Sequence, residues 1–179
     1  MARISHRAPL GFGTFRKFVY DTDGGEGVDV YVIDTGINID HVEFEGRAEW
    51  GTTVPQNDQD VDGNGHGTHC AGTIASRKYG VAKKANLYAV KVLGSNGSGS
   101  MSDVVKGVGF AAEAAKTKAA SNKGNHKGSV ANMSLGGTKS VALNKAVNKA
   151  VQGGLHFAVA AGRWRLCDDF SFSNWPVYR

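Results

Sequence analysis

Short runs of β-branched and aromatic residues alternate along this chain with longer stretches of helical spacing. The first run, Val28-Asp29-Val30-Tyr31-Val32-Ile33, stops at Asp34-Thr35-Gly36, which is typical of a buried strand that ends in a turn. Further strands are predicted over residues 86–92, 129–135 and 155–160. Because the intervening stretches are long enough for crossover connections, the sequence predicts an α/β fold, a doubly wound and mostly parallel sheet with helices on both faces.

Two of the intervening stretches have apolar residues spaced by three and four, which gives a helix one buried stripe. Ser102 is the predicted cap of the first helix and Ser140 of the second, and Gly153-Gly154 is predicted to end the second. The first stripe consists of Val104, Val105, Val108, Ala111, Ala112 and Ala115. The second consists of Val141, Leu143, Ala146, Val147, Ala150 and Val151.

The composition agrees with a globular domain and excludes several other classes. The 179 residues are 41% hydrophobic, and no apolar run approaches the ~20 residues of a membrane span. The formal charge of +5 is scattered along the chain and not gathered in one tract, which favours a solvated surface. The amino terminus has no apolar core of a signal peptide, and two cysteines are too few for a disulfide scaffold.

The first 27 residues differ in texture from the rest and are predicted to form an extended amino-terminal segment. They are polar and punctuated by glycine, apart from an aromatic cluster of Phe12, Phe15, Phe18 and Tyr20. We expect this cluster to pack against the body of the domain.

One carboxylate and one imidazole fall where a parallel sheet places its ligand site, outside the carboxyl ends of the strands. Asp34 ends a buried strand with little access to solvent, so it needs a hydrogen-bond partner. Glycines 63, 65 and 67 lead into a helix of small residues, with His66 in its first turn. A general base needs an imidazole whose second nitrogen is held by a carboxylate, and this pattern predicts that arrangement for Asp34 and His66.

Four ordered motifs resemble those of the subtilase family of serine proteases, closest to its proteinase K-like and fungal vacuolar (cerevisin-type) branch. Val32-Ile33-Asp34-Thr35-Gly36 resembles the aspartate motif, and Gly65-His66-Gly67-Thr68-His69-Cys70-Ala71-Gly72-Thr73 resembles the histidine motif. The segment Asn132-Met133-Ser134-Leu135-Gly136-Gly137 resembles the substrate-binding strand, and Ala160-Ala161-Gly162 resembles the wall of the primary specificity pocket.

The resemblance implies a role for each matching residue. Asp34 would orient the base and His66 would be the base, while Cys70 resembles a free thiol that this branch keeps beside the active site. An extended peptide would be clamped as an added strand between two backbone edges, and the specificity pocket would lie beside them. The predicted substrate-binding residues are Gly97, Ser98, Gly99, Ser134, Leu135, Gly136, Ala160, Ala161 and Gly162.

The sequence also departs from the family pattern after residue 162. Arg163 occupies the position at which the family has the asparagine that stabilises the oxyanion, and no Gly-Thr-Ser-Met-Ala segment follows with the nucleophile. We therefore expect residues 28–162 to be the amino-terminal part of a peptidase domain and 163–179 to be a divergent tail. The chain by itself is predicted to be catalytically incomplete.

Other functional classes remain open at this stage. The same cleft could serve a peptide-binding module without catalysis, and a basic nucleic-acid-binding domain is a weaker alternative because no aromatic residues interleave the lysines. No metal or other cofactor is expected. Calcium occurs in the family, but residues 76–81 lack its acidic ligands. The resemblance implies a peptide substrate, an inhibitory propeptide and a secreted or vacuolar location, with no nucleic-acid or membrane partner.

Overall fold

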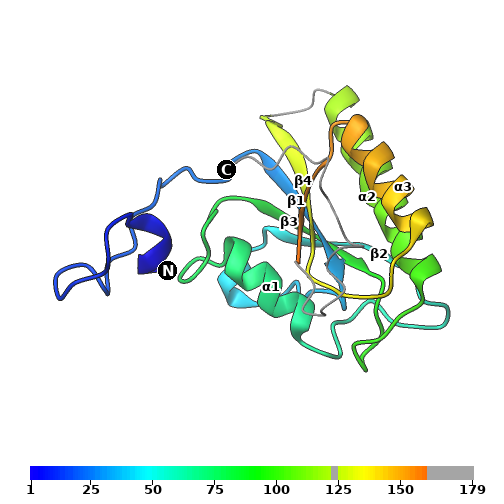
Figure 1. Cartoon of the computed structure of the whole chain (residues 1–179), viewed down its shortest axis with the longest axis horizontal. Helices are drawn as coiled ribbons and strands as arrows, with labels where there is room; N and C mark the ends of the chain where they lie inside the picture. The colour runs from blue at the N-terminus through cyan, green and yellow to red at the C-terminus, as the bar shows by residue number, and fades with distance from the viewer. Residues whose placement is uncertain (122–124, 161–179) are drawn as a thin grey trace.

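A computed structural model gives the structure of this chain and describes residues 1–121 and 125–160. Within them, five strands form one sheet and three α-helices pack on it (Figure 1). The strands are β1 (Val28–Asp34), β2 (Ala48–Thr53), β3 (Asn86–Lys91), β4 (Gly128–Met133) and β5 (His156–Val159). The helices are α1 (His66–Ala75), α2 (Met101–Ser121) and α3 (Val141–Gln152), and two short 3₁₀ helices span Ala2–Ser5 and Val42–Phe44.

The sheet is parallel throughout and has the order β2-β3-β1-β4-β5. Strand β1 lies at its centre, with Asp34 opposite Lys91 of β3 and Val32 opposite Asn132 of β4. From β1 the chain passes to the edge strand β2, returns to β3 beside β1, and then crosses to β4 and β5 on the other side. Such a switch in direction opens a crevice at the carboxyl ends of the central strands, where these folds bind ligands.

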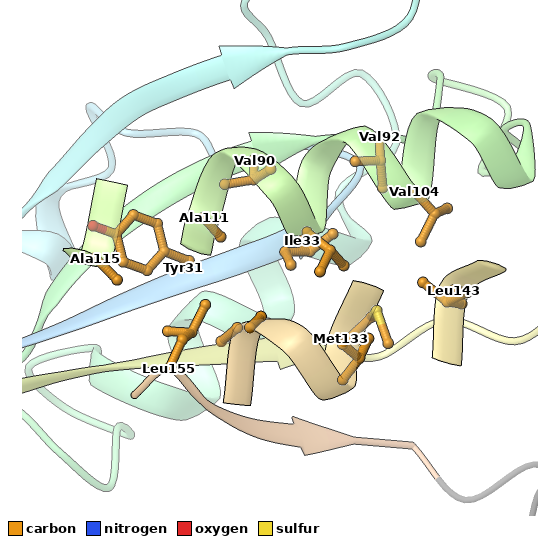
Figure 2. Packing of buried hydrophobic residues seen from close by; sticks show 14 residues of the cluster. Tyr31, Ile33, Val90, Val92, Val104, Ala111, Ala115, Met133, Leu143 and Leu155 are labelled. Atoms are coloured by element: carbon orange, nitrogen blue, oxygen red, sulfur yellow. The ribbon is translucent and has the colours of Figure 1, made fainter. Parts of the chain in front are cut away.

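Helices cover both faces of the sheet, as predicted: α1 lies on one face, and α2 and α3 lie side by side on the other (Figure 1). The alternation of β1 supplies both cores. Val30 and Val32 pack in the cluster that includes Ala71 of α1, whereas Tyr31 and Ile33 pack in the cluster of α2 and α3. Figure 2 shows the second cluster, in which Ile33, Val90 and Met133 of the sheet meet Val104 of α2 and Leu143 of α3. The α/β fold expected from the sequence is confirmed.

Strand β2 was not predicted, and its sequence explains the omission. Ala48-Glu49-Trp50-Gly51-Thr52-Thr53 has one large apolar residue, a glycine in its middle and no regular alternation. It is an edge strand, mostly half-buried, and its register with β3 shifts between Trp50 and Thr52. Edge strands need less apolar surface than central ones, so their sequence signal is weaker.

Both helix predictions on the α2–α3 face hold, with two local corrections. Ser140 caps α3 through a hydrogen bond from Leu143 N, as expected. At α2, however, Ser100 accepts the hydrogen bond from Asp103 N, so the cap is Ser100 and not Ser102. Val141, the first residue of α3, is 63% exposed and does not belong to its buried stripe, which contains Leu143, Val147 and Ala150. None of the helices formed by the described residues combines the length and apolar character needed to cross a bilayer.

The amino-terminal segment extends away from the sheet, and the expected packing of its aromatic cluster is only partly found (Figure 1). Phe12 is 97% exposed, so its predicted contact with the domain is wrong. Phe18 and Tyr20 stack on each other, and Lys83 Nζ lies over both rings. A cation over two aromatic faces, rather than an apolar core, anchors this end of the segment.

Candidate active site

Asp34 is the last residue of β1 and is fully buried at the carboxyl edge of the sheet. Its main-chain oxygen accepts hydrogen bonds from Val92 N and Leu93 N, which follow β3. Its side-chain Oδ1 accepts a hydrogen bond of 2.7 Å from Thr35 N. Central pairing on both sides of β1 and these bonds hold the carboxylate in one orientation.

Helix α1 begins at His66 and comes unusually close to the end of β1. Gly65, which precedes it, has φ of 94°, in the left-handed region that favours glycine. A Cβ on Gly67 would lie 2.1 Å from the carbonyl oxygen of Gly36 and 3.2 Å from Cβ of Asp34. The small residues predicted to allow close packing are therefore required at this contact.

The close approach brings the predicted carboxylate and imidazole together. His66 Nδ1 lies 2.8 Å from Oδ1 and 2.9 Å from Oδ2 of Asp34, distances at which Nδ1–H donates to the carboxylate. The Asp34 side chain has no exposed surface, whereas that of His66 is 50% exposed. Anchored on one side by a buried carboxylate, the imidazole leaves Nε2 available on the other. In residues 1–121 and 125–160, no serine hydroxyl is hydrogen-bonded to this ring.

Cys70 lies one turn after His66 on α1, with Sγ 4.0 Å from Nδ1 of the histidine. Burial raises the pKa of its thiol, so the thiol stays protonated and weakly nucleophilic at neutral pH. The potential ligand atoms of Asp34, His66 and Cys70 lie within 4.8 Å of one another, the one such group in the part of the chain that the structure describes. Nδ1 of His66 is already hydrogen-bonded to Asp34, which fits a carboxylate–imidazole pair better than a metal centre.

A cleft of about 610 Å³ opens beside His66 and collects most of the predicted substrate-binding residues. One side is formed by Gly97, Ser98 and Gly99, and the other by Ser134, Leu135 and Gly136. Ala160 also lines the cleft, whereas Ala161, Gly162 and Arg163 lie outside the described residues. The cleft is also lined by apolar residues, namely Leu93, Met101, Val104, Met133, Leu143 and Val159.

Four residues that support the site, Thr35, Asp58, Asp62 and Lys91, were not assigned a role from the sequence. Thr35 joins β1 to α1, because its Oγ1 accepts a hydrogen bond from Gly67 N and donates one to Asp62. Lys91 is completely buried, and its Nζ donates to the carbonyl oxygen of Thr35 and pairs with Asp58. A lysine at the end of an apolar strand and an aspartate before a glycine-rich turn were the available signals, but neither specifies a partner.

Comparison with known proteins identifies the family. The model of the subtilase family matches residues 25–165. Since this match covers well over half of the chain, the chain belongs to the subtilase family.

Individual relatives agree with this assignment. The chain is 70% identical over 166 residues to subtilisin-like protease 8 of Trichophyton verrucosum, covering 90% of the chain and 34% of the relative. It is 72% identical over 167 residues to the subtilisin-like serine protease Pen c 2 of Penicillium citrinum, covering 90% of the chain and 36% of that relative. The chain thus spans about a third of the length of these curated relatives.

A solved structure has the same architecture. A cold-adapted subtilisin-like serine proteinase superposes with a TM-score of 0.77 at 45% identity, covering 90% of this chain and 54% of that chain. The resemblance of the four motifs to subtilases is therefore confirmed at the level of family and fold.

Proposed function

We propose that this chain supplies the aspartate, the general base and part of the substrate cleft of a serine endopeptidase. The observation that carries the proposal is the contact of His66 Nδ1 with a fully buried Asp34 while the other side of the ring adjoins the cleft. Family membership and the names of the relatives support the same reaction class.

In the proposed reaction, Asp34 holds His66 in the tautomer that carries its proton on Nδ1. Nε2 then accepts the proton of an attacking serine hydroxyl and later donates it to the leaving amine. The buried carboxylate stabilises the imidazolium that forms between the two steps. The serine must come from residues other than those described, because none of the described serines is hydrogen-bonded to the imidazole.

The substrate proposed for the cleft is an extended peptide of a protein. Gly97, Ser98 and Gly99 on one side, and Ser134, Leu135 and Gly136 on the other, present main-chain groups to which a peptide strand can pair. The apolar residues that line the cleft would accommodate hydrophobic side chains of the peptide. Ala160, Ala161 and Gly162 are proposed to form the wall of the primary specificity pocket, and Arg163 to stand at the oxyanion position.

Covalent labelling tests the proposed reaction. We would compare the 179-residue chain with a version whose residues after 162 are replaced by the remaining domain of a relative, including its serine segment. A peptidyl phosphonate should label the extended protein and leave the shorter chain unlabelled. In the extended protein, His66→Ala should abolish labelling, and so should alanine at the introduced serine. Efficient labelling of the His66→Ala variant, or proteolysis by the purified shorter chain, would refute the proposal.

The cleft also supports peptide binding without cleavage as a second candidate function. A Cβ on Gly136 would meet no atom within 4 Å, so Gly136→Val should preserve the fold and obstruct the cleft. Gly109 of α2 is equally unobstructed and does not line the cleft, so Gly109→Val is the matched control. A fluorescent apolar peptide should lose affinity for the first variant only. Equal affinity for both variants would show that the peptide binds elsewhere.

Partners and location follow from the family resemblance alone. We propose that an inhibitory propeptide binds the same cleft in a precursor and that the protein acts in a secreted or vacuolar setting. No cofactor is proposed for the reaction.

A further inference from the structure

Of the carboxylates near the cleft in residues 1–121 and 125–160, Asp62 accepts the most hydrogen bonds, and none of these comes from Asp34 or His66. Its Oδ1 accepts from Thr35 Oγ1 at 2.8 Å, from Gly65 N at 2.8 Å and from Asn64 N at 3.1 Å. Its Oδ2 accepts from Thr68 N at 2.9 Å and from the Thr68 hydroxyl. One side chain thus joins the end of β1, the glycine-rich turn and the first turn of α1.

These bonds replace the cap that helix α1 lacks. Gly65 at its N-cap position has no side chain, so the free main-chain N–H groups of the first turn need other acceptors. Asp62 takes the N–H groups of Gly65 and Thr68, and Thr35 takes that of Gly67. These three N–H groups belong to residues on either side of His66 in the sequence. They donate to Asp62 and Thr35, whose side chains are hydrogen-bonded to each other. A carboxylate at this end of a helix is also favoured by the helix dipole.

The same turn is attached to the sheet by two further aspartates, and these have different anchors. Asp58 pairs with Lys91 at the end of β3 at 3.3 Å, and Asp60 accepts a hydrogen bond of 2.6 Å from Thr53 at the end of β2. Of the three aspartates, Asp62 is the one bonded both to Thr35, which directly follows Asp34 at the end of β1, and to Thr68 in the first turn of α1. Asp60 therefore offers a natural control: a carboxylate of the same turn that is bonded to neither element.

From this network we infer that Asp62 is a positioning residue that fixes the imidazole of His66 against Asp34 by clamping the first turn of α1 to the end of β1. The inference rests on the proposed function and extends it to a residue that touches neither the substrate nor the reacting atoms. Ionisation of Asp62 suits this role. Burial alone would raise the pKa of Asp62, but the hydrogen bonds from Thr68, Gly65 and Thr35 outweigh it and lower that pKa.

The imidazole Nδ1 proton of His66 gives a direct test in the 179-residue chain. When this proton is held by Asp34, proton NMR should show it as a separate low-field signal in slow exchange with water. Asp62→Asn keeps the size of the side chain but replaces an acceptor oxygen with a donor. We expect this variant to lose the low-field signal through faster exchange, and Asp60→Asn to retain it. A purely structural role would lower the stability of both variants without separating their spectra.

A second pair of variants reaches the same clamp if Asp62→Asn does not fold. Thr35→Val removes the hydroxyl that links Asp62 to Gly67 N, and Thr35→Ser keeps it. The signal should be lost in the valine variant and restored in the serine variant. Retention of the signal in Asp62→Asn or, where that variant does not fold, in Thr35→Val, would overturn the inference, and so would equal loss in Asp60→Asn.

The Asp34→Asn variant separates failure of this inference from failure of the proposed function. If Asp34→Asn leaves the low-field signal intact, the carboxylate–imidazole pair itself is wrong and the proposed function fails. If Asp34→Asn removes the signal and Asp62→Asn does not, only the role of Asp62 is refuted.

Discussion

The two ends of strand β1 each carry a buried aspartate, and they differ in what surrounds the carboxylate. Asp29 near the amino end is 2% exposed and Asp34 at the carboxyl end is fully buried. Asp29 is surrounded by three side chains: Lys118 Nζ lies at 3.2 Å, His126 Nε2 at 3.7 Å and the Asn86 amide nitrogen at 2.9 Å. Asp34 has a main-chain donor and a single imidazole.

The histidines beside the two carboxylates differ in access. The side chain of His126 is 14% exposed and that of His66 is 50% exposed. The Lys118 side chain is 44% exposed, but it lies over the ring of Tyr88, which stacks on Tyr31, and it does not line the cleft beside His66. A buried carboxylate at a sheet edge is therefore no sign of catalysis by itself. What distinguishes Asp34 is a partner that remains open to a cleft.

The largest expected difference between the two aspartates is in turnover. In the protein extended with a serine segment, Asp34→Asn should lower kcat by about 10⁴, the loss known for this change in the triad of another serine protease. The physical reason is that an amide no longer selects the tautomer with its proton on Nδ1. Asp29→Asn should leave kcat within about threefold, because Asp29 does not contact His66. A threefold change is less than the about 1.4 kcal/mol of activation free energy that corresponds to tenfold in rate. Steady-state hydrolysis of a peptide substrate measures both. Equal losses would remove the contrast on which the site assignment depends.

Stability should show the opposite order. Asp29→Asn breaks an ion pair with Lys118, and we expect the free energy of unfolding to fall by about 2–3 kcal/mol. This figure is below the about 3–5 kcal/mol of a fully buried pair, because the Lys118 side chain is 44% exposed and can turn to water. Asp34→Asn should cost less than about 1 kcal/mol, since no lysine or arginine of the described residues pairs with Asp34. Urea unfolding of the two variants, which carry the same substitution on one strand, would contradict this if Asp34→Asn were the more destabilised.

The close contact of α1 with β1 is a further difference, since it exists only at the carboxyl end. Gly67→Ala would place a methyl group against the carbonyl oxygen of Gly36, and we expect a loss of about 1–2 kcal/mol as the helix shifts outward. Gly72 on the same helix has open space around it, so Gly72→Ala should instead add stability, by up to about 1 kcal/mol. Thermal unfolding measures both changes. Equal stability of the two variants would show that α1 adjusts freely.

The smallest expected effect is on the pH dependence of stability, which should differ between the two ends of β1. The lowered pKa of Asp62 means that its contribution to stability is present at neutral pH and is lost as the pH falls below about 4. At the other end, burial and the charge of Asp29 raise the pKa of Tyr31 to about 12. That contribution is present below about pH 10 and is lost as the pH rises toward 12.

Variants at each end test this separation. Asp62→Asn should flatten the acid limb of a plot of Tm against pH, and Tyr31→Phe should flatten the alkaline limb, each by no more than about 4 °C. A hydrogen bond to Tyr88 and the pairing with Asp29 raise the pKa of Lys118, which acts in the same direction as Tyr31. Lys118 should therefore leave part of the alkaline limb in Tyr31→Phe. A variant that flattened the opposite limb would show that the two ends are coupled.

Much of the fold could be predicted from local pattern, because β1, β3, β4 and α3 carry strong periodic signals. The β-branched run of β1 and the stripe of Leu143, Val147 and Ala150 on α3 need no partner to be interpreted. Strand β2 was missed because its pairing with β3, and not its own composition, holds it in the sheet. The division of the chain at residues 27 and 162 and the roles assigned to the cleft residues stay predictions.

Local sequence alone accounts for the alternation of strands and helices, the placement of Asp34 at a strand end and the glycines that let His66 approach it. These features depend on residues adjacent in the chain, where periodicity and backbone freedom act directly. The packing of distant segments is needed to join Asp62 to Thr35 and α1, to bury Lys91 against Thr35 and to pair Asp29 with Lys118. A hydrogen bond between distant segments is set by how whole elements pack, and an isolated aspartate or lysine in the sequence does not specify its partner.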